Sequence, residues 1–471
     1  MQKESFGEKE KYLPWIAAMA IFMQSLDGTI LNTSLPSIAK DMNYSPLEMQ
    51  SIIVSYTLTL AILIPLSGWL SDKFGTKRTF TFALAVFTLG SLFCAISPSL
   101  STLIISRIIQ AIGGSMMVPV ARLAILYKYP KNELLRVINF MTIPGLIGPV
   151  IGPSLGGWLS DNLSWHWVFL VNLPIGIAGI YLTQKVMPNF KNTVSKFDTT
   201  GLIYFSLTIV LITLVMELTS VGITSFTMIL IFVALAMICF LLYVRHSKRT
   251  KAPIIDLKLL EIRTLRIGLS GSLFTRLGIG GIPFLLPLML QVGFGYSAST
   301  AGLMLLPSAV TTVLIKPWVV PLVKSLGYKK VLVSNTLILA TIIGMFSLAT
   351  SQTPLLYMII LMIFYGAFNS IQMASMNTIS LSDLDNDNAS AGNSLLAIMQ
   401  QLSISFGISV AALILSYFKD AGNFFHGETA NAFKYTFISL GAITALSSLI
   451  FFRLKNNDGH LLSGNEQKRS A

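Results

Sequence analysis

Five ionisable side chains stand inside long apolar stretches of this 471-residue sequence, where an unpaired charge is costly: Asp27, Arg107, Glu217, Arg276 and Lys316. A buried carboxylate within reach of a cation can bind and release a proton as its access to water changes. We therefore expect Asp27, with Gln24 one turn before it, to carry a proton, and Arg107 to tune that exchange. A static Asp27–Arg107 bridge that only joins two helices is the alternative.

The other buried charges have two interpretations each. Arg276 stands among Gly278, Gly280 and Gly281, either as a cavity cation that meets substrate or the acid, or as a packing residue. Lys316 lies nearer the end of its stretch and can extend toward the headgroups, so we expect a gate or interface residue. Glu217 lies at a stretch end, where interfacial placement is expected.

Polar side chains within apolar stretches supply the rest of a predicted substrate cavity, because amides that face lipid are costly. Besides Gln24 and Arg276, this set comprises Asn32, Gln110, Asn369, Gln372, Asn393 and Gln400. Hydrogen bonds between helices use the same residue types, so a packing role remains open for each of them.

These residues are positioned by apolar blocks of about twenty residues, the length that crosses a hydrocarbon core as a helix. Only 11% of the chain is charged and 53% is hydrophobic, against about 25% charged in a soluble domain. The blocks predict fourteen helices, at 13–35, 49–70, 79–97, 101–122, 136–160, 166–186, 200–218, 225–245, 265–290, 298–322, 331–350, 354–377, 390–418 and 433–454. The fold class is thus an all-α polytopic membrane protein.

The basic residues predict the orientation of these helices. Only Lys40, Lys419 and Lys434 fall on one set of alternate connections, and Arg107, Arg276 and Lys316 lie within helices. The other 27 of the 33 Lys and Arg residues occupy the termini and the opposite connections. Positive charge favours the cytoplasmic side, so both termini are predicted there, and the net charge of +13 needs no nucleic-acid partner. The acidic run Asp383, Asp385 and Asp387 has no assigned role.

A glycine and charge motif follows the second predicted helix. It reads Gly68-Trp-Leu-Ser-Asp72-Lys-Phe-Gly75-Thr-Lys-Arg78. Its glycines permit a tight turn, and its charges can lock to each other and to helix ends. This motif resembles the most specific signature of the major facilitator superfamily, and we expect Gly68, Asp72, Gly75 and Arg78 to act in gating.

Three further motifs are similar to signatures of the same superfamily. Stretch 101–122 carries Arg107-Ile-Ile-Gln110-Ala-Ile-Gly113-Gly114, similar to its proton-linked arginine motif. Stretch 136–160 carries Gly145-Leu-Ile-Gly148-Pro149-Val-Ile-Gly152-Pro153-Ser-Leu-Gly156-Gly157, which looks like the antiporter signature. Residues 26–36, which include Asp27 and Asn32, resemble the first-helix motif of the fourteen-helix branch. The glycines of stretch 136–160 form one smooth face and its prolines permit bending, so Gly148, Pro149, Gly152 and Pro153 are expected to act in gating, as is Lys316.

The chain therefore resembles the fourteen-helix drug:proton antiporters of EmrB/QacA type. The resemblance implies two six-helix bundles, at 1–195 and 263–455, an inserted helix pair and linker at 196–262, and a cytoplasmic tail at 456–471. One departure is visible at Leu322-Val-Lys324-Ser-Leu-Gly327-Tyr-Lys-Lys330, where Lys324 replaces the acid of the first turn. A symmetric pair of cytoplasmic latches is not expected.

The predicted function is proton-coupled export of a drug or metabolite by alternating access, driven by the proton gradient with no cofactor, metal or enzymatic step. The expected partners are a small-molecule substrate, protons and lipids of the bacterial inner membrane, and a monomer is expected. Three alternatives remain: export of an anionic metabolite or siderophore, proton-coupled import, and a non-transporting receptor or scaffold.

Overall fold

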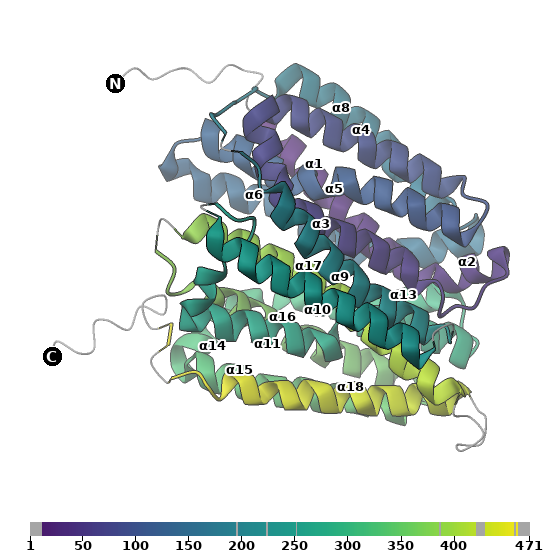
Figure 1. The fold of residues 1–471 in the computed structure, drawn as a ribbon. Coiled ribbons are helices and arrows are strands. Elements are labelled where there is room, and N and C mark those ends of the chain that lie inside the picture. Colours follow the sequence, from purple (N-terminus) through teal and green to yellow (C-terminus); the bar gives the residue numbers. More distant parts are fainter. Residues whose placement is uncertain are drawn as a thin grey trace. The chain divides into compact units, whose positions relative to one another are not determined.

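The computed structural model describes residues 12–194, 196–222, 225–250, 252–385, 388–420, 429–455 and 458–459. Within these ranges, 13 helices are long and apolar enough to span a membrane, and the number is 14 if one bent pair is counted as a span. The predicted all-helical, polytopic fold is confirmed (Figure 1). The chain divides into two compact units, which we describe separately.

Unit 1 comprises residues 1–197 and the short segment Ala298–Gly302. Its helical elements are α1 (Leu13–Ile30), a 3-10 turn (Leu31–Thr33), α2 (Leu35–Met42), α3 (Gln50–Phe74), α4 (Thr76–Ala95), α5 (Leu100–Lys128), α6 (Lys131–Asn162), α7 (Trp167–Leu170) and α8 (Asn172–Val186). Helix α4 packs against α5 and α8, and Figure 1 shows α4 and α8 side by side.

Helices α1 and α6 form an intimate pair because the glycines of α6 face α1. A Cβ atom at Gly152 would collide with the Thr29 hydroxyl, and one at Gly156 with the Ile30 carbonyl oxygen. The same contact lets Thr33 donate from Oγ1 to the Pro153 carbonyl at 2.8 Å. Small residues thus allow the two backbones to approach and bond directly.

Several helices extend beyond the apolar blocks that predict them. The helix expected to end at residue 122 continues to Lys128, so Arg122 lies within α5 rather than in a connection. The next helix begins at Lys131, directly after Pro130. Proline disfavours helical geometry in the residue before it, and Tyr129 is accordingly extended.

Unit 2 comprises Asp198–Ser297 and the chain from Leu303 onward. Its helical elements are α9 (Thr199–Ser220), α10 (Phe226–Arg249), a 3-10 turn (Leu257–Glu261), α11 (Arg263–Ile279), α12 (Ile282–Leu288), a π turn (Met289–Gly293), α13 (Ala298–Leu314, whose first five residues group with unit 1), α14 (Lys316–Leu326), α15 (Tyr328–Met345), a 3-10 turn (Phe346–Leu348), α16 (Leu355–Leu381), α17 (Ala389–Asp420) and α18 (Thr429–Phe451).

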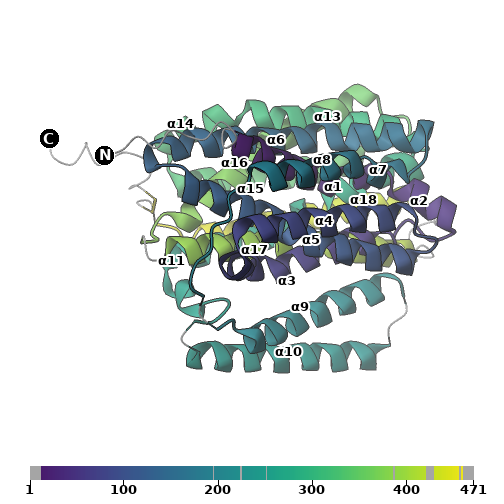
Figure 2. The ribbon, with the colours of Figure 1, turned by 90° about the horizontal axis from the view of Figure 1, so that it is seen from above.

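The inserted pair, α9 and α10, runs side by side as a hairpin within unit 2 (Figure 2). The Asp198 carboxylate caps α9 by accepting from the Gly201 amide at 2.8 Å, and it pairs with His246 Nε2 at 2.6 Å near the end of α10. Helix α9 also packs against α17. The predicted division into two bundles and a separate insert stays a prediction, and the tail at 456–471 lies outside the described residues apart from 458–459.

Two predicted helices are interrupted. The stretch at 265–290 breaks between α11 and α12 at Gly280 and Gly281, where Gly407 of α17 approaches the backbone closely. The stretch at 298–322 bends by 57° between α13 and α14. Pro317 follows this bend immediately, and a proline ring lacks the N–H that would continue the helical hydrogen bonding.

Candidate functional site

Asp27 lies in α1, inside a membrane span that runs from Leu13 to Thr33. At 1.5 Å per residue it is about 21 Å from the Leu13 end, so it lies past the middle of the span. Its side chain is 1% exposed. A carboxylate this deep must be either neutral or fully paired.

Three side chains donate hydrogen bonds to this carboxylate. Arg107 Nη1 of α5 donates to Oδ2 at 2.8 Å. Gln110 Nε2, one turn further along α5, donates to Oδ1 at 2.8 Å, and Asn172 Nδ2 of α8 donates to the same oxygen at 2.9 Å. Three donors, one of them a cation, satisfy an ionised carboxylate. The structure therefore brings together Asp27, Arg107 and Gln110, all predicted from the sequence.

The Arg107 guanidinium is enclosed as completely as its partner. It is 1% exposed, stacks over the Tyr56 ring at 4.1 Å from the centroid, and donates from Nε to the Ile52 carbonyl at 3.4 Å. Its Nη1 also donates to Gln110 Oε1 at 2.6 Å. A planar guanidinium can make these contacts at once, whereas an ammonium cannot.

Sequence reasoning missed Asn172, Ser91 and Tyr56. Ser91 Oγ of α4 accepts from Gln110 Nε2 at 2.6 Å and from Asn172 Nδ2 at 3.2 Å, so the network joins α1, α4, α5 and α8. Two buried polar atoms in this cluster, the acceptor Asn172 Oδ1 and the Tyr56 hydroxyl, have no hydrogen-bond partner among the described residues. Asn172 is an amide in an apolar span, the same signal that selected Gln110.

The remaining predicted residues of the first helix lie apart from this network. Gln24 is partly exposed and its Oε1 has no hydrogen-bond partner among the described residues. Asn32 is 7% exposed and lies in the turn that ends the span. Gly28, next to Asp27, is exposed, and a Cβ there would meet nothing within 4 Å.

In unit 2, Arg276 is partly exposed near the end of α11 and donates from Nε to Ser272 Oγ at 3.2 Å. No ion pair of Arg276 is found within the described ranges. The neighbouring Tyr365 of α16 donates to the Ile279 carbonyl at 3.3 Å. A cation in a membrane span without a counter-ion remains available to an anionic group.

The predicted cavity amides of unit 2 differ in their surroundings. Gln372 is fully buried, and both ends of its side-chain amide form hydrogen bonds with α15. Its oxygen accepts from Asn335 and its nitrogen donates to Thr336, each at 2.8 Å. Here it serves helix packing. Gln400 donates to Asn377 of α16 at 2.9 Å. Asn369 keeps a buried Oδ1 without a described partner, and Asn393 is exposed near the start of α17.

The turn between α3 and α4 is bound to the segment that follows α8. Asp72 Oδ1 accepts from Asn192 Nδ2 at 2.9 Å and from the Tyr127 hydroxyl at 3.2 Å. Gly75, at φ +97°, faces Asn189 so closely that a Cβ there would collide with it. Arg78 is exposed and forms no ion pair with Asp72 in the described ranges. Asp72 therefore binds the segment after α8 and not the basic residue of its own motif. A Cβ atom added at Gly68 would have no neighbour within 4 Å.

The corresponding turn of unit 2 keeps the glycine without the acid. Gly327 adopts φ +79° between α14 and α15, and Lys324 is exposed on the preceding turn. Lys316 is exposed as the first residue of α14, directly after the 57° bend. Glu217 lies in the last turn of α9. Of the acidic run, Asp383 accepts from Ser382 at 3.1 Å, and Asp387 lies outside the described residues.

A buried acid and arginine within a bundle of membrane-spanning helices are typical of a membrane transporter. The family model of the Major Facilitator Superfamily matches residues 17–249, 197–408 and 268–470. The chain belongs to this superfamily, and it is an integral inner membrane protein and a transporter, not an enzyme.

Similar proteins cover nearly the whole chain. A "Putative multidrug resistance protein MdtD" of Pectobacterium atrosepticum is 43% identical over 442 residues, which are 93% of this chain and 95% of that protein. The protein of that name from Escherichia coli O6:H1 is 41% identical over 461 residues, 97% of each chain. Among solved structures, a D-xylose–proton symporter gives a TM-score of 0.66 at 15% identity over 95% of this chain and 99% of that one. A POT family transporter gives 0.68 at 15% identity over 93% and 94%, and both share the fold.

Proposed function

We propose that this chain is a proton-coupled exporter of drugs or related small molecules, of the fourteen-helix EmrB/QacA type, working by alternating access. The multidrug resistance names of relatives that are 41% and 43% identical support the substrate class. The bent pair α13–α14 supports the count of 14 spans. The proton gradient supplies the energy, and no cofactor takes part.

The observation that carries the proton coupling is the Asp27 carboxylate, 1% exposed and held by Arg107, Gln110 and Asn172. This geometry suits the ionised acid, with one formal charge on each side of the ion pair. A proton that arrives at Asp27 weakens the bond to Arg107 and releases the α1–α5 contact. Loss of the proton restores it, so the two states of the acid favour two arrangements of these helices.

The direction follows from the proposed topology. The 27 basic residues on one set of connections favour cytoplasmic termini. Asp27 then lies nearer the outer side, because it is about 21 Å from the Leu13 end of its span. Protons enter from outside, where their concentration is higher, and substrate enters from the cytoplasm.

The test uses purified protein in proteoliposomes with ethidium as the cationic probe and norfloxacin as the zwitterionic probe. The parent should accumulate at least one probe against its gradient when a proton gradient is imposed, and a protonophore should abolish this. Asp27→Asn should lose the gradient-driven accumulation while retaining exchange of labelled for unlabelled probe. Asp41→Asn removes an acid from α2, outside the apolar spans, and should behave as the parent.

Three outcomes would contradict the proposal. Full accumulation by Asp27→Asn would remove the proton role of this residue. Accumulation only under the opposite gradient would indicate proton-coupled import. Absence of any flux or exchange, with the protein folded, would favour a receptor or scaffold.

A second candidate is export of substrates that carry a carboxylate, and Arg276 favours it because no ion pair occupies its guanidinium in the described ranges. Arg276→Gln should weaken transport of norfloxacin by about tenfold and leave ethidium within about twofold, if one charge-assisted hydrogen bond to a carboxylate is lost. Equal effects on both probes would assign Arg276 to packing.

A further inference from the structure

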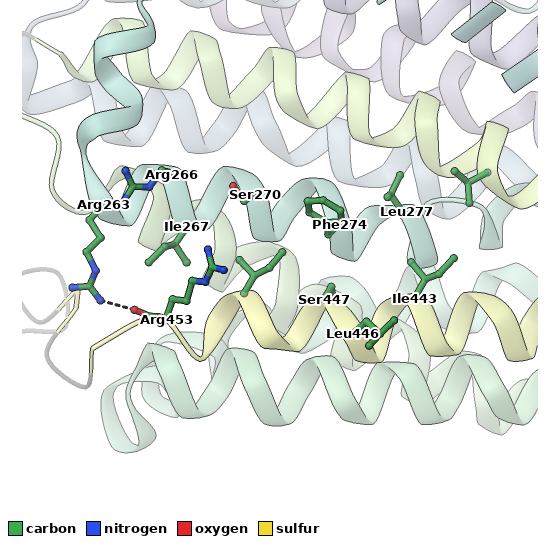
Figure 3. A pocket seen from close by; sticks show the side chains of 12 residues that line it. Arg263, Arg266, Ile267, Ser270, Phe274, Leu277, Ile443, Leu446, Ser447 and Arg453 are labelled. Carbon is green, nitrogen blue, oxygen red and sulfur yellow. Dashed lines mark hydrogen bonds between the residues drawn. The ribbon is translucent and has the colours of Figure 1, made fainter. Parts of the chain in front are cut away.

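A groove of about 850 Å³ opens along α11 and α18 in unit 2 (Figure 3), and Val410 of α17 also lines it. Its walls are mainly apolar. Phe274 is 47% exposed and Leu446 is 65% exposed, and Leu277 and Ile443 lie at its far end. Large apolar side chains exposed on a membrane-spanning unit are suited to contact with lipid acyl chains.

The charge in this groove is confined to one end. Arg263, Arg266 and Arg453 gather where α11 begins and α18 has just ended (Figure 3). The Arg263 guanidinium already has partners, because it pairs with Asp458 at 3.2 Å and donates to the Arg453 carbonyl at 2.6 Å. The exposed side chains of Arg266 and Arg453 have no ion pair among the described residues. Two positive charges at this end of the groove therefore lack a counter-ion there.

The length of the groove matches one leaflet. From Arg266 to Leu277 the helix rises about 16 Å at 1.5 Å per residue. Half of a hydrocarbon core is about 15 Å. A ligand that fills the groove therefore has its charge at the headgroup level and its apolar part along one leaflet, which is the shape of a phospholipid.

We propose that this groove binds an anionic phospholipid from the leaflet at that end, with the phosphate at Arg266 and Arg453 and an acyl chain along Phe274 and Leu446. Guanidinium groups bind phosphate through paired N–H donors, and basic pockets beside membrane helices recognise anionic headgroups. A zwitterionic headgroup brings an ammonium group together with its phosphate, so its net charge offsets neither arginine, whereas the net charge of an anionic headgroup offsets one of the two. The proposal is independent of proton coupling and of which side of the membrane this end faces.

The binding test uses the full-length purified protein, delipidated in detergent, with lipid binding read by native mass spectrometry. Phosphatidylglycerol and phosphatidylethanolamine with identical acyl chains are the two probes. The parent should bind phosphatidylglycerol at least about tenfold more tightly, a preference of about 1.4 kcal/mol. The double variant Arg266→Gln with Arg453→Gln should reduce this preference to within about twofold, as expected when charge-assisted contacts are lost.

A matched control removes two arginines elsewhere. Arg245→Gln with Arg249→Gln changes two exposed arginines near the end of α10, outside the groove, and should keep the full preference. Ser270→Trp places a bulky ring in the groove and should weaken both lipids. Thermal unfolding of each delipidated variant should match the parent, which separates lost binding from misfolding.

The proposal is overturned if the parent binds the two lipids equally, or if the Arg266 and Arg453 variant keeps the preference. It is also overturned if the control pair loses the preference as strongly. Displacement of phosphatidylglycerol by an equal concentration of glycerol phosphate would assign the site to soluble anions instead.

Discussion

Asn172 Nδ2 donates to Asp27 Oδ1 at 2.9 Å, while the buried Oδ1 of the same amide has no hydrogen-bond partner among the described residues. The Asn172 amide thus donates to the carboxylate, while its own acceptor oxygen is unused. In the proposed cycle, a proton on Asp27 creates an O–H donor, and rotation of the Asn172 amide would present its acceptor to that donor. Asn172 is therefore suited to follow the protonation state of its neighbour.

Replacement of Asn172 by alanine should slow gradient-driven export about tenfold, since one buried hydrogen bond contributes about 1 kcal/mol or more. Exchange of labelled for unlabelled probe, which needs no net proton movement, should stay within about twofold. Proteoliposome flux measures both. Asn162→Ala, which removes an exposed amide bonded to the Trp158 carbonyl, is the control. Equal loss of both activities would make Asn172 a packing residue.

Stability and transport should respond differently when both members of the Asp27–Arg107 pair are replaced. Asp27→Ala leaves the buried Arg107 charge unpaired and should cost about 3–5 kcal/mol of stability. Adding Arg107→Met removes that charge and should recover most of the melting temperature without recovering proton-driven export. Thermal unfolding in detergent and proteoliposome flux are the measurements. Export by the double variant at the parental rate would mean that the pair is only a bridge.

The glycine face of α6 should tolerate no added methyl group. A Cβ at Gly156 would collide with the Ile30 carbonyl, so Gly156→Ala should destabilise the protein by about 1–3 kcal/mol through overpacking. Gly68→Ala, inside α3 with nothing within 4 Å of its Cβ, should leave stability unchanged or raise it by up to about 1 kcal/mol. Melting temperatures compare the two. A destabilised Gly68→Ala variant would contradict this description of the α3 surface.

Residues 188–192, which follow α8, should become more mobile when the hydrogen bonds of Asn192 are removed. Asn192 donates to Asp72 at 2.9 Å and to the Tyr127 hydroxyl at 2.8 Å. Asn192→Ala should speed amide hydrogen exchange at residues 188–192 about tenfold, because about 1.4 kcal/mol of local protection is lost. Lys77→Gln, which loses one exposed bond to the Gln184 carbonyl, should change it little. Unchanged exchange in Asn192→Ala would show that backbone contacts alone hold the segment.

The membrane-spanning helices could be predicted from the sequence because lipid requires about twenty apolar residues per span. Their ends could not, since helices continue past the hydrocarbon wherever no proline or glycine stops them. Lys128 is an example, being six residues beyond the expected end of its helix at residue 122. The break at Gly280 and Gly281 could not be predicted either, because it depends on the close approach of Gly407 from another helix.

The candidate site could be predicted in part for a related reason. Charged residues inside membrane spans are so rare that Asp27 and Arg107 could be predicted as partners from the sequence. The structure places Arg107 Nη1 2.8 Å from Asp27 Oδ2. Neutral amides are common in such spans, and their roles depend on which helix faces them. Gln372 and Asn172 have the same sequence signal, yet the first joins α15 to α16 and the second reaches the buried acid.

The enclosure of Arg107 has an electrical consequence for the whole cluster. A guanidinium keeps its charge at any physiological pH, so a proton on Asp27 turns a neutral cluster into one with a net positive charge. At 1% exposure, that charge has no water to stabilise it. In the proposed cycle, a proton on Asp27 therefore requires water to enter the cluster, because a buried unpaired charge is costly.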